Sequence, residues 1–348
     1  MANFDDLQGA VAQFGAGNKV IYDDIGMPSI MVGVPKMTYA DIITGGTNEV
    51  LPFFIVDGEE KNAIYVSKFI NIVENDRAYS LGMKLPRNYI TFDQAVAACK
   101  KKGNGWHLNQ TGVFALLNLL SQKMGTVPHG NTNYGKDNYH TYEHGIMPQG
   151  ETQRTLTGSG PATWYHNHDS AGIADLNGNL WEWTGGLRLV DGEIQIIPYG
   201  NCMKLDCDMS AESTLWKAIM PDGRLVEPGT AGTLKIDRTS ASDETPKIST
   251  TVTTRTTDSN DTNCIFKNLV AASGVSIPKL LVALGLFPDS GASYGNDHFW
   301  ARNNGERLPF RGSAFHDTSF SGPSALSLHD VRSGSGDGIG FRSAFCEL

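Results

Sequence analysis

Short apolar stretches bounded by Gly, Pro and Asp turns dominate the N-terminal part of the chain. The stretches VIYDDI (20–25), SIMVGV (29–34) and LPFFIVDG (51–58) each predict a strand, because apolar runs between turn signals are typical of β-structure. We expect these strands to form an N-terminal lead-in segment, residues 1–58, before a larger domain that covers residues 59–348.

Two helices are predicted by apolar residues at helical spacing. The stretch TFDQAVAACKKKG (91–103) has a Thr cap, Asp93 in its first turn, lysines in its last turn and a closing glycine. The stretch TGVFALLNLLSQKMG (111–125) repeats this pattern. Because start and stop signals enclose both apolar patterns, we expect a helix in each stretch.

Two long stretches lack the period that a helix or strand requires. Residues 125–170, rich in Gly, Asn, His and Tyr, predict a long ordered loop. The expected aromatic anchors of this loop are Tyr134, Tyr139, Tyr142, Trp164 and Tyr165. Residues 238–263 are polar and Thr-rich, and predict a surface insertion. With 39 glycines and few helical stretches, the chain is expected to be an α+β protein in which turns and short strands dominate.

Composition and charge narrow the class of protein. The 348 residues, 40% of them hydrophobic, can bury a large core in one or two domains. The net charge of −9 argues against nucleic acid or an anionic membrane as the main partner. No apolar run is long enough to span a bilayer, and the start MANFDDLQGA lacks the pattern of a signal peptide. We therefore expect no membrane insertion, and synthesis in the cytoplasm with any export by another route.

Cysteines and histidines offer only weak signals for chemistry. The five cysteines are odd in number, irregularly spaced and without a CxxC motif, which predicts reduced thiols. Cys202 and Cys207 could form a redox or metal pair, but small buried residues are the favoured interpretation. His166 and His168 would share one face of a strand and could bind a metal. Without a third ligand, loop hydrogen bonding is favoured.

The stretch NGNLWEW (177–183) places one acid between two tryptophans. In a strand, Trp181 and Trp183 share one face and Glu182 points to the other. The tryptophans are expected to pack in the core, and the carboxylate is expected to face a partner.

Five sequence blocks together resemble the formylglycine-generating-enzyme-like branch of the C-type lectin fold. The blocks, in chain order, are YVSKFINIV, FDQAVAACKKKGNGWHL, DLNGNLWEWTGG, RGSAF and GIGFR. They span roughly residues 60–348, and the D-x-x-G-N-x-W-E-W block is the most specific of them. The resemblance implies an α+β C-type lectin fold with short strands, two helices and long ordered loops.

The same resemblance implies a calcium site. In that family the acid of the Trp-Glu-Trp block, an oxygen-bearing side chain seven residues earlier and backbone carbonyls between them bind calcium. The corresponding positions here are Asp175, Gly178, Leu180 and Glu182. Hard oxygen donors suit Ca²⁺ rather than zinc or copper. The alternative is that a backbone or Arg partner holds Glu182. No organic cofactor is expected.

The C-terminal part, about residues 294–342, resembles the variable proteins of diversity-generating retroelements, many of them carried by phages and prophages. In that family a reverse transcriptase rewrites adenine positions in a C-terminal cassette, while a frame of other residues stays fixed. The implied frame is Arg311, Gly312, Phe315, Gly322, Ala325, Leu326, Leu328, Arg332, Ser333, Ile339, Gly340, Phe341 and Arg342. The implied changeable, ligand-binding positions are Ala314, His316, Asp317, Phe320, Ser327, His329, Asp330, Gly334, Gly336 and Asp337.

The residue pattern of the cassette supports a contact surface independently. Between Phe315 and Phe341 the apolar residues are sparse and regular, and His, Asp, Ser and Gly fill the gaps. Such a stretch cannot be a core strand throughout, and it predicts a scaffold that exposes an adaptable set of side chains. An ordinary Gly-rich surface loop is the alternative.

The chain lacks the catalytic cysteines of the enzyme family that it resembles. Formylglycine-generating enzymes need two closely spaced cysteines after the Arg-Gly strand to hold copper. This chain has Ala314, His316, Asp317 and Thr318 there, and its one C-terminal cysteine is Cys346. We therefore predict that the protein is not an enzyme but inherits the scaffold alone.

The predicted function is ligand binding through the diversified C-terminal surface. The expected partner is a protein or glycan on a cell surface, recognised by a phage or prophage adhesin located on the virion tail or at a cell surface. Two alternatives are an oxidoreductase of the formylglycine-generating or nonheme-iron type, and a structural virion protein.

Overall fold

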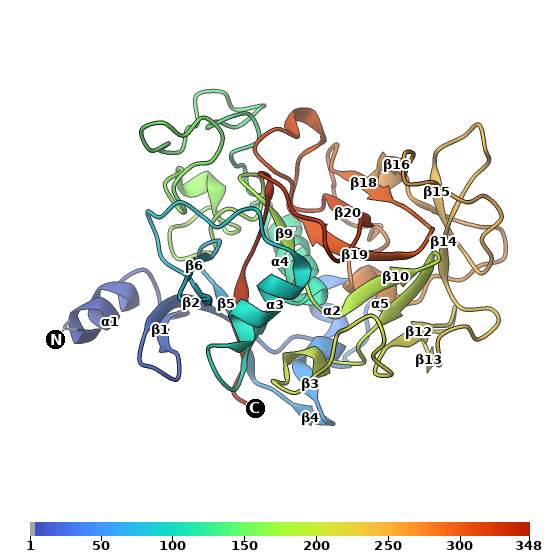
Figure 1. Ribbon diagram of the computed structural model, residues 1–348, viewed down its shortest axis with the longest axis horizontal. Helices are drawn as coiled ribbons and strands as arrows, with labels where there is room; N and C mark the ends of the chain where they lie inside the picture. Colours follow the sequence, from blue (N-terminus) through green and yellow to red (C-terminus); the bar gives the residue numbers. More distant parts are fainter. Residues whose placement is uncertain (1–3) are drawn as a thin grey trace.

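The computed structural model describes residues 4–348 and contains five α-helices and twenty-two short strands (Figure 1). The helices are α1 (Phe4–Ala12), α2 (Tyr39–Ile42), α3 (Phe92–Lys100), α4 (Thr111–Met124) and α5 (Lys279–Ala283). The α+β class with short strands and long loops is confirmed. The expected number of two helices is too low, because α1 and two helices of four and five residues carry no clear signal in the sequence.

Both helices predicted from cap signals are present. Thr91 caps α3 by accepting a hydrogen bond from the backbone N–H of Gln94, and the Gln94 side chain completes the capping box. Helix α4 ends at Gly125, whose φ of 70° is the left-handed conformation that glycine tolerates best. The N-cap of α4 is Gln110 rather than Thr111, because the Thr111 hydroxyl instead accepts a hydrogen bond from Arg311.

One sheet joins the two ends of the chain. Its strands, in spatial order, are β1 (Asn18–Tyr22), β2 (Pro28–Pro35), β5 (Ala63–Ser67), β22 (Ser343–Phe345) and β8 (Trp106–Leu108). Since β2 pairs with β5 along its length and β22 pairs with both β5 and β8, residues 1–58 do not form a separate lead-in segment. The predicted boundary after residue 58 is therefore wrong for this sheet.

The strand predicted over residues 51–58 is mostly a turn. Pro52–Phe54 form a 3-10 turn, and only β3 (Ile55–Val56) is extended, paired with β4 (Glu59–Glu60). Proline lacks the backbone N–H that a sheet ladder requires, which explains the break. A further small hairpin joins β6 (Ile72–Glu74) and β7 (Arg77–Tyr79).

The second sheet is larger and contains thirteen strands. Its main path is β16 (Thr262–Ile265), β18 (His298–Ala301), β20 (Leu326–Asp330), β19 (Glu306–Arg311), β10 (Leu187–Val190), β11 (Glu193–Ile196), β14 (Lys235–Arg238), β15 (Pro246–Ser249) and β17 (Val270–Ala271). Four strands branch from this path: β9 (Trp181–Trp183), β12 (Lys217–Ile219), β13 (Leu225–Val226) and β21 (Ile339–Phe341).

The polar stretch 238–263 is not wholly a surface insertion. It supplies β15, in which Ile248 is fully buried, and the start of β16. Its polar groups are satisfied locally, since the buried Asp237 carboxylate accepts hydrogen bonds from Thr253 and Thr254. The sequence therefore looks like a loop although the backbone extends a sheet.

Helix α4 lies between the two sheets (Figure 1). Its Val113, Phe114, Leu116 and Leu117 are at most 1% exposed and belong to the core cluster that includes residues of β2 and β5. A helix that is apolar on nearly all sides requires cover on all sides, and the sheets and loops provide it.

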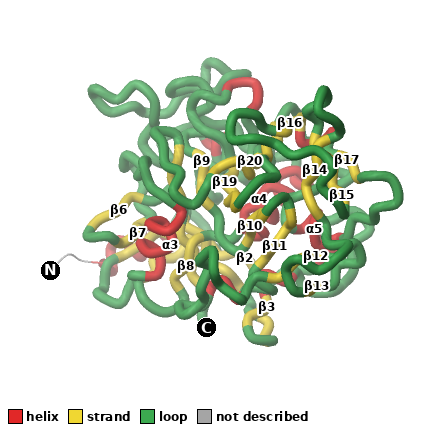
Figure 2. The backbone as a smooth tube through the Cα atoms, turned by 45° about the vertical axis from the view of Figure 1, so that its right-hand side comes forward, coloured by secondary structure: helices red, strands yellow, loops and turns green. Residues whose placement is uncertain are grey.

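Long loops make up much of the backbone path (Figure 2). The ordered loop predicted over residues 125–170 is confirmed, with one 3-10 turn at Ala162–Trp164. Only two of its predicted anchors are buried, Trp164 and Tyr165. The other three, Tyr134, Tyr139 and Tyr142, are 52%, 60% and 77% exposed, so they do not anchor the loop by burial. Two of them still contact the C-terminal part of the chain, since the Tyr134 ring packs against Phe315 and the Tyr139 hydroxyl donates to the Ser319 carbonyl.

Strand β9 joins two strands of the cassette. It pairs antiparallel with β19, which lies within the cassette, and parallel with β21, which closes it. Glu182 lies opposite Arg311 on one side and Gly340 on the other. Because β9 pairs with both strands, the segment between β19 and β21 begins and ends beside the same strand.

The buried Asp297 supports the middle of the segment between β19 and β21. Its Oδ2 accepts a hydrogen bond of 2.7 Å from the backbone N–H of Ser324. Its carboxylate also lies against Gly322, where a Cβ atom would collide with it, which explains the glycine in the predicted frame. Burial raises the pKa of Asp297 from 3.8 to about 7.

This raised pKa predicts a pH dependence of stability. The folded state favours the protonated carboxyl. The contribution of Asp297 to the free energy of unfolding is therefore full below about pH 4 and is lost as the pH rises through about 7. Asp297→Asn keeps an acceptor for Ser324 without the charge. We expect the variant to lose less unfolding free energy than the parent protein between about pH 5 and pH 8, measured by urea denaturation. Equal losses in the two proteins would contradict the assignment.

Candidate ligand-binding site

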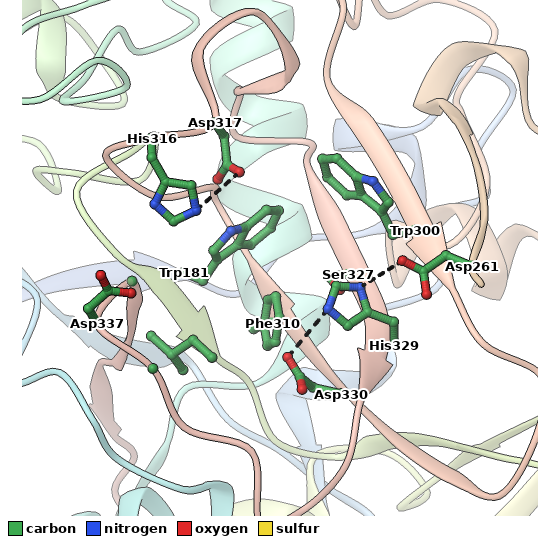
Figure 3. A pocket seen from close by; sticks show the side chains of 13 residues that line it. Trp181, Asp261, Trp300, Phe310, His316, Asp317, Ser327, His329, Asp330 and Asp337 are labelled. Carbon is green, nitrogen blue, oxygen red and sulfur yellow. Dashed lines mark hydrogen bonds and ion pairs between the residues drawn. The ribbon is translucent and has the colours of Figure 1, made fainter. Parts of the chain in front are cut away.

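Seven of the ten predicted changeable positions line one cavity of about 340 Å³. These seven are His316, Asp317, Ser327, His329, Asp330, Gly336 and Asp337. Six further residues complete the lining: Trp181, Asp261, Trp300, Phe310, Gly338 and Ile339. Figure 3 shows the side chains of this cavity, which come from β9, β18, β19, β20, β21 and the connecting loops.

Three neighbouring strands explain why distant residues meet here. In the register of the sheet, Ser327 on β20 lies opposite Trp300 on β18 and opposite Phe310 on β19. Residues opposite one another in a sheet project to the same face, so these three side chains form one row. Trp181 on β9 extends the row, with its ring 5.1 Å from Phe310 and 5.8 Å from Trp300.

Over residues 326–329, strand β20 separates predicted changeable from predicted frame positions by alternation. Leu326 and Leu328 are fully buried on one face of the strand. Ser327 and His329 project to the other face and line the cavity. Since successive side chains of a strand point to opposite faces, a change at 327 or 329 is directed away from the leucine core.

His329 is held between two carboxylates. Its Nδ1 lies 3.8 Å from Asp261 and its Nε2 lies 3.4 Å from Asp330, as the dashed lines in Figure 3 mark. The Ser327 hydroxyl lies 3.0 Å from Nδ1. These contacts fix the orientation of the imidazole at the cavity wall. Asp261 comes from the Thr-rich stretch, and nothing in the local sequence marks it as part of a site.

The second histidine of the cavity also has an acidic neighbour. His316 Nε2 lies 3.8 Å from Asp317, whose Oδ2 accepts a hydrogen bond of 2.6 Å from the backbone N–H of Ala314. Burial raises the pKa of Asp317, against the opposing effects of that hydrogen bond and of His316. The His316 side chain is 42% exposed, so this pair lies at the open side of the cavity.

Three predicted positions lie outside the cavity. Ala314 is fully buried in a core cluster, so the prediction that it displays a side chain is corrected. Phe320 is 48% exposed, and its ring contacts His298, which in turn contacts Trp300. Phe320 therefore lies at the rim. Gly334 is half-buried in the turn that follows β20.

The predicted frame residues are mostly buried. Ten of them are buried: Arg311, Gly312, Phe315, Gly322, Ala325, Leu326, Leu328, Gly340, Phe341 and Arg342. Ile339 is half-buried in the cavity wall, and Arg332 is half-buried in ion pairs with Glu306 and Asp93. Ser333 is exposed, so its place in the frame has no structural explanation.

Arg311, the last residue of β19, ties the cassette to α4 and to the turn after α5. Its guanidinium donates to the Thr111 hydroxyl of α4 at 2.9 Å and to the Leu284 carbonyl after α5 at 2.6 Å. Burial lowers its pKa to about 9. The sequence pointed to a frame role for this arginine but not to these partners.

Glu182 is paired with Arg342. The guanidinium donates to both carboxylate oxygens at 2.6 Å, and also to the carbonyls of Ser67 and Ala174 at 2.9 and 3.0 Å. Burial raises the pKa of Glu182, while Arg342 opposes this shift. The pair matches the alternative interpretation of Glu182, in which an arginine holds the carboxylate.

The donors implied for calcium do not fit the ion in this arrangement. Arg342 engages both Glu182 oxygens, and the Gly178 carbonyl accepts a hydrogen bond from Leu180. The buried Asp175 carboxylate accepts from the Gly158 N–H, and burial raises its pKa to about 6. A Ca²⁺ ion needs six to eight oxygen ligands, which these groups do not present together. Calcium binding therefore stays a hypothesis.

The histidines and cysteines that the sequence offered as weak candidates for chemistry have structural roles. His166 Nδ1 accepts a hydrogen bond from the Ile173 N–H, and His168 Nε2 contacts the Val127 carbonyl, which confirms local hydrogen bonding. All five cysteines are free, and Cys202 and Cys207 are buried. Burial raises the pKa of the Cys207 thiol to about 11.

The described residues offer neither a cluster of metal ligands nor a membrane-spanning helix. Among residues 4–348, no group of three or more His, Cys, Asp or Glu side chains is placed to hold a metal ion. No helix in the same range has the length and apolar character needed to cross a bilayer.

Comparison with known proteins finds similarity at the level of structure. No protein-family model matches the sequence, and no curated protein sequence matches it. PvdO from Pseudomonas aeruginosa matches with a TM-score of 0.38 and 12% identity, over 94% of this chain and 98% of that one. Treponema denticola variable protein 1 matches with a TM-score of 0.35 and 11% identity, over 95% and 99% of the two chains.

The I1 variant of the Major Tropism Determinant matches with a TM-score of 0.32 and 11% identity, over 94% of this chain and 71% of that one. Solved structures named as a variable protein and as tropism determinants are thus among those similar to this chain.

The calcium hypothesis is decided by melting curves. Because Arg342 already neutralises Glu182, we expect the same melting temperature in EDTA and in excess calcium, for protein shown to be metal-free. Asp175→Asn should respond to calcium in the same way as the parent protein. A calcium-dependent rise in melting temperature that disappears in Asp175→Asn would establish the site and contradict our expectation.

Proposed function

We propose that this protein is a non-catalytic ligand-binding protein, and that the cavity bounded by its C-terminal cassette contacts a protein or glycan on a cell surface. One observation carries the proposal. Changeable positions from three separate stretches, 316–317, 327–330 and 336–337, converge on one cavity. Positions predicted from the cassette pattern would be scattered if the cassette were an ordinary surface loop.

The division between frame and cavity supports the proposal further. A surface that varies must keep its backbone while its side chains change. Here β19 and β21 are fixed by β9, and frame side chains point into the core. The seven predicted changeable residues that line the cavity lie outside the apolar core clusters, so replacing them leaves the contacts of those clusters in place.

The cavity also has the composition of an adaptable contact surface. Its rigid aromatic residues, Trp181, Trp300 and Phe310, provide contact area, while His, Asp and Ser side chains provide hydrogen-bonding groups. Antibody binding loops combine these two kinds of side chain for the same reason. Aromatic residues at the centre of an interface supply much of its binding free energy.

We propose a location on a virion tail or at a cell surface, in keeping with an adhesin of a phage or prophage. The cysteine pair of the formylglycine-generating enzymes has no counterpart near the cavity, since Cys346 is buried beyond β22 and does not line it. The side chains present at residues 314–318 provide no thiolate for that chemistry.

The test is a cassette variant with five changes. His316→Ala, Asp317→Asn, Phe320→Ala, His329→Ala and Asp330→Asn are combined in one protein. We expect binding of the labelled protein to a panel of bacterial cells and glycans to fall at least about tenfold, because aromatic and hydrogen-bonding contacts are lost. Its melting temperature should change little, because the five side chains lie outside the apolar core clusters and the Asn replacements keep an oxygen acceptor at 317 and 330.

A matched control carries changes on a distant exposed surface. Tyr199→Ala, Leu205→Ala and Asp206→Asn lie outside the cavity and are exposed. This variant should bind every cell or glycan that the parent protein binds. If both variants bind as the parent does, the cavity is not the contact surface and the proposed function is wrong.

A further inference from the structure

The permanently charged groups that line the cavity are all acidic. Four carboxylates line it, from Asp261, Asp317, Asp330 and Asp337, and none of the described residues that line it is Lys or Arg. The ionisable groups that accompany them are the imidazoles of His316 and His329. When both imidazoles are neutral, the lining carries negative charge alone.

Most of this charge has no permanent counter-charge within the described chain. Asp261 forms an ion pair with Arg302, whose guanidinium lies outside the lining. Asp330 forms an ion pair with His329 alone. A carboxylate that faces a neutral imidazole keeps its full attraction for an incoming cation.

The other two carboxylates are compensated only by polar groups and by a histidine. Asp317 accepts from a backbone N–H and lies near His316. Asp337 accepts a hydrogen bond of 3.0 Å from the Gln153 amide. Three of the four carboxylates therefore lack a Lys or Arg partner among residues 4–348. Three other cavities of the described chain each have at least one Lys or Arg in their lining, which this cavity does not.

Aromatic rings lie beside these carboxylates. Trp181 and Trp300 meet edge to face, and Phe310 packs against Trp181 and against His329 (Figure 3). The face of an aromatic ring attracts a cation, and tryptophan does so most strongly. The same rings, with Ile339, offer apolar contact for an alkyl chain.

The combination of carboxylates and aromatic rings in the lining favours one class of ligand over others. An anionic group would be repelled by the carboxylates and would lose hydration without a partner. A bare metal ion is disfavoured because no three carboxylates or imidazoles of the described chain converge on one point. A volume of about 340 Å³ is large for an ion but suits a side chain with a charged end.

We propose that the cavity recognises an organic cation, the ammonium or guanidinium end of a Lys or Arg side chain on a protein partner. The carboxylates bind the charged end and the rings of Trp181, Trp300 and Phe310 contact the alkyl stem. This inference rests on the proposed function and adds the chemical class of the ligand.

The test uses small probes with the intact chain. N-acetyl-lysine methylamide and N-acetyl-arginine methylamide are titrated beside the neutral N-acetyl-norleucine methylamide and beside glucosamine, and the tryptophan side-chain N–H signals are followed by NMR. The lysine or arginine probe should bind at least about tenfold more tightly than norleucine, because charge-assisted contacts and cation–π attraction are specific to the cation. Added salt should weaken this binding.

A paired variant locates the binding. In Asp330→Asn with Asp337→Asn, the preference over norleucine should fall to about twofold or less, while the exposed control Asp206→Asn keeps the full preference. If norleucine binds as tightly as the cations, or if no probe binds, the inference is overturned without any variant. Tighter binding of glucosamine than of both amino-acid probes would overturn the protein side chain as the ligand.

The two proposals fail in different ways. If cell binding depends on the cassette but the cations do not bind, the inference alone is wrong. If cell binding does not depend on the cassette, the proposed function is wrong whatever the probes do.

Discussion

A buried ion pair between Glu182 and Arg342 is the contact on which the arrangement of the cassette depends. Glu182 lies on β9, the strand that pairs with both β19 and β21, and Arg342 directly follows β21. The same guanidinium donates to the carbonyls of Ser67 and Ala174, so it also links β9 to β5 of the smaller sheet. Breaking such a pair leaves a buried charge unpaired, which typically costs about 3 to 5 kcal/mol.

This contact fixes the position of the segment between β19 and β21 without using the side chains that line the cavity. Both ends of the segment are fixed on one strand, and Arg311 and Asp297 hold its start and its middle through hydrogen bonds to helices and to the backbone. The side chains on the other face of β20 then have no part in those contacts. A rigid frame with replaceable side chains is the physical requirement for a surface that changes its ligand.

Local sequence signals predicted the parts that depend on neighbouring residues. The cap of Thr91, the glycine after α4 and the two faces of the Trp-Glu-Trp strand each follow from a few adjacent residues. The cassette pattern, with its resemblance to variable proteins, placed seven positions that meet in one cavity.

Contacts between distant parts of the chain could not be predicted. Arg342 lies 160 residues from Glu182, so the sequence left the partner of the acid open between calcium and an arginine. Asp261 lines the cavity although it belongs to a polar stretch whose sequence resembles a loop. The pairing of β2 with β5 could not be predicted either, because nothing in the two sequences indicates which residues lie opposite each other. Ala314 failed as a display position because burial depends on tertiary packing rather than on its place in the cassette.

The most direct test of the division between frame and cavity is a saturation scan of residues 311–342, with folding measured by protease resistance of the displayed protein. The account predicts that His316, Asp317, His329 and Asp337 accept most polar and aromatic replacements. It predicts that the buried frame positions accept few: Arg311, Phe315, Leu328, Phe341 and Arg342. Equal tolerance in the two sets, or greater tolerance in the frame, would contradict the account.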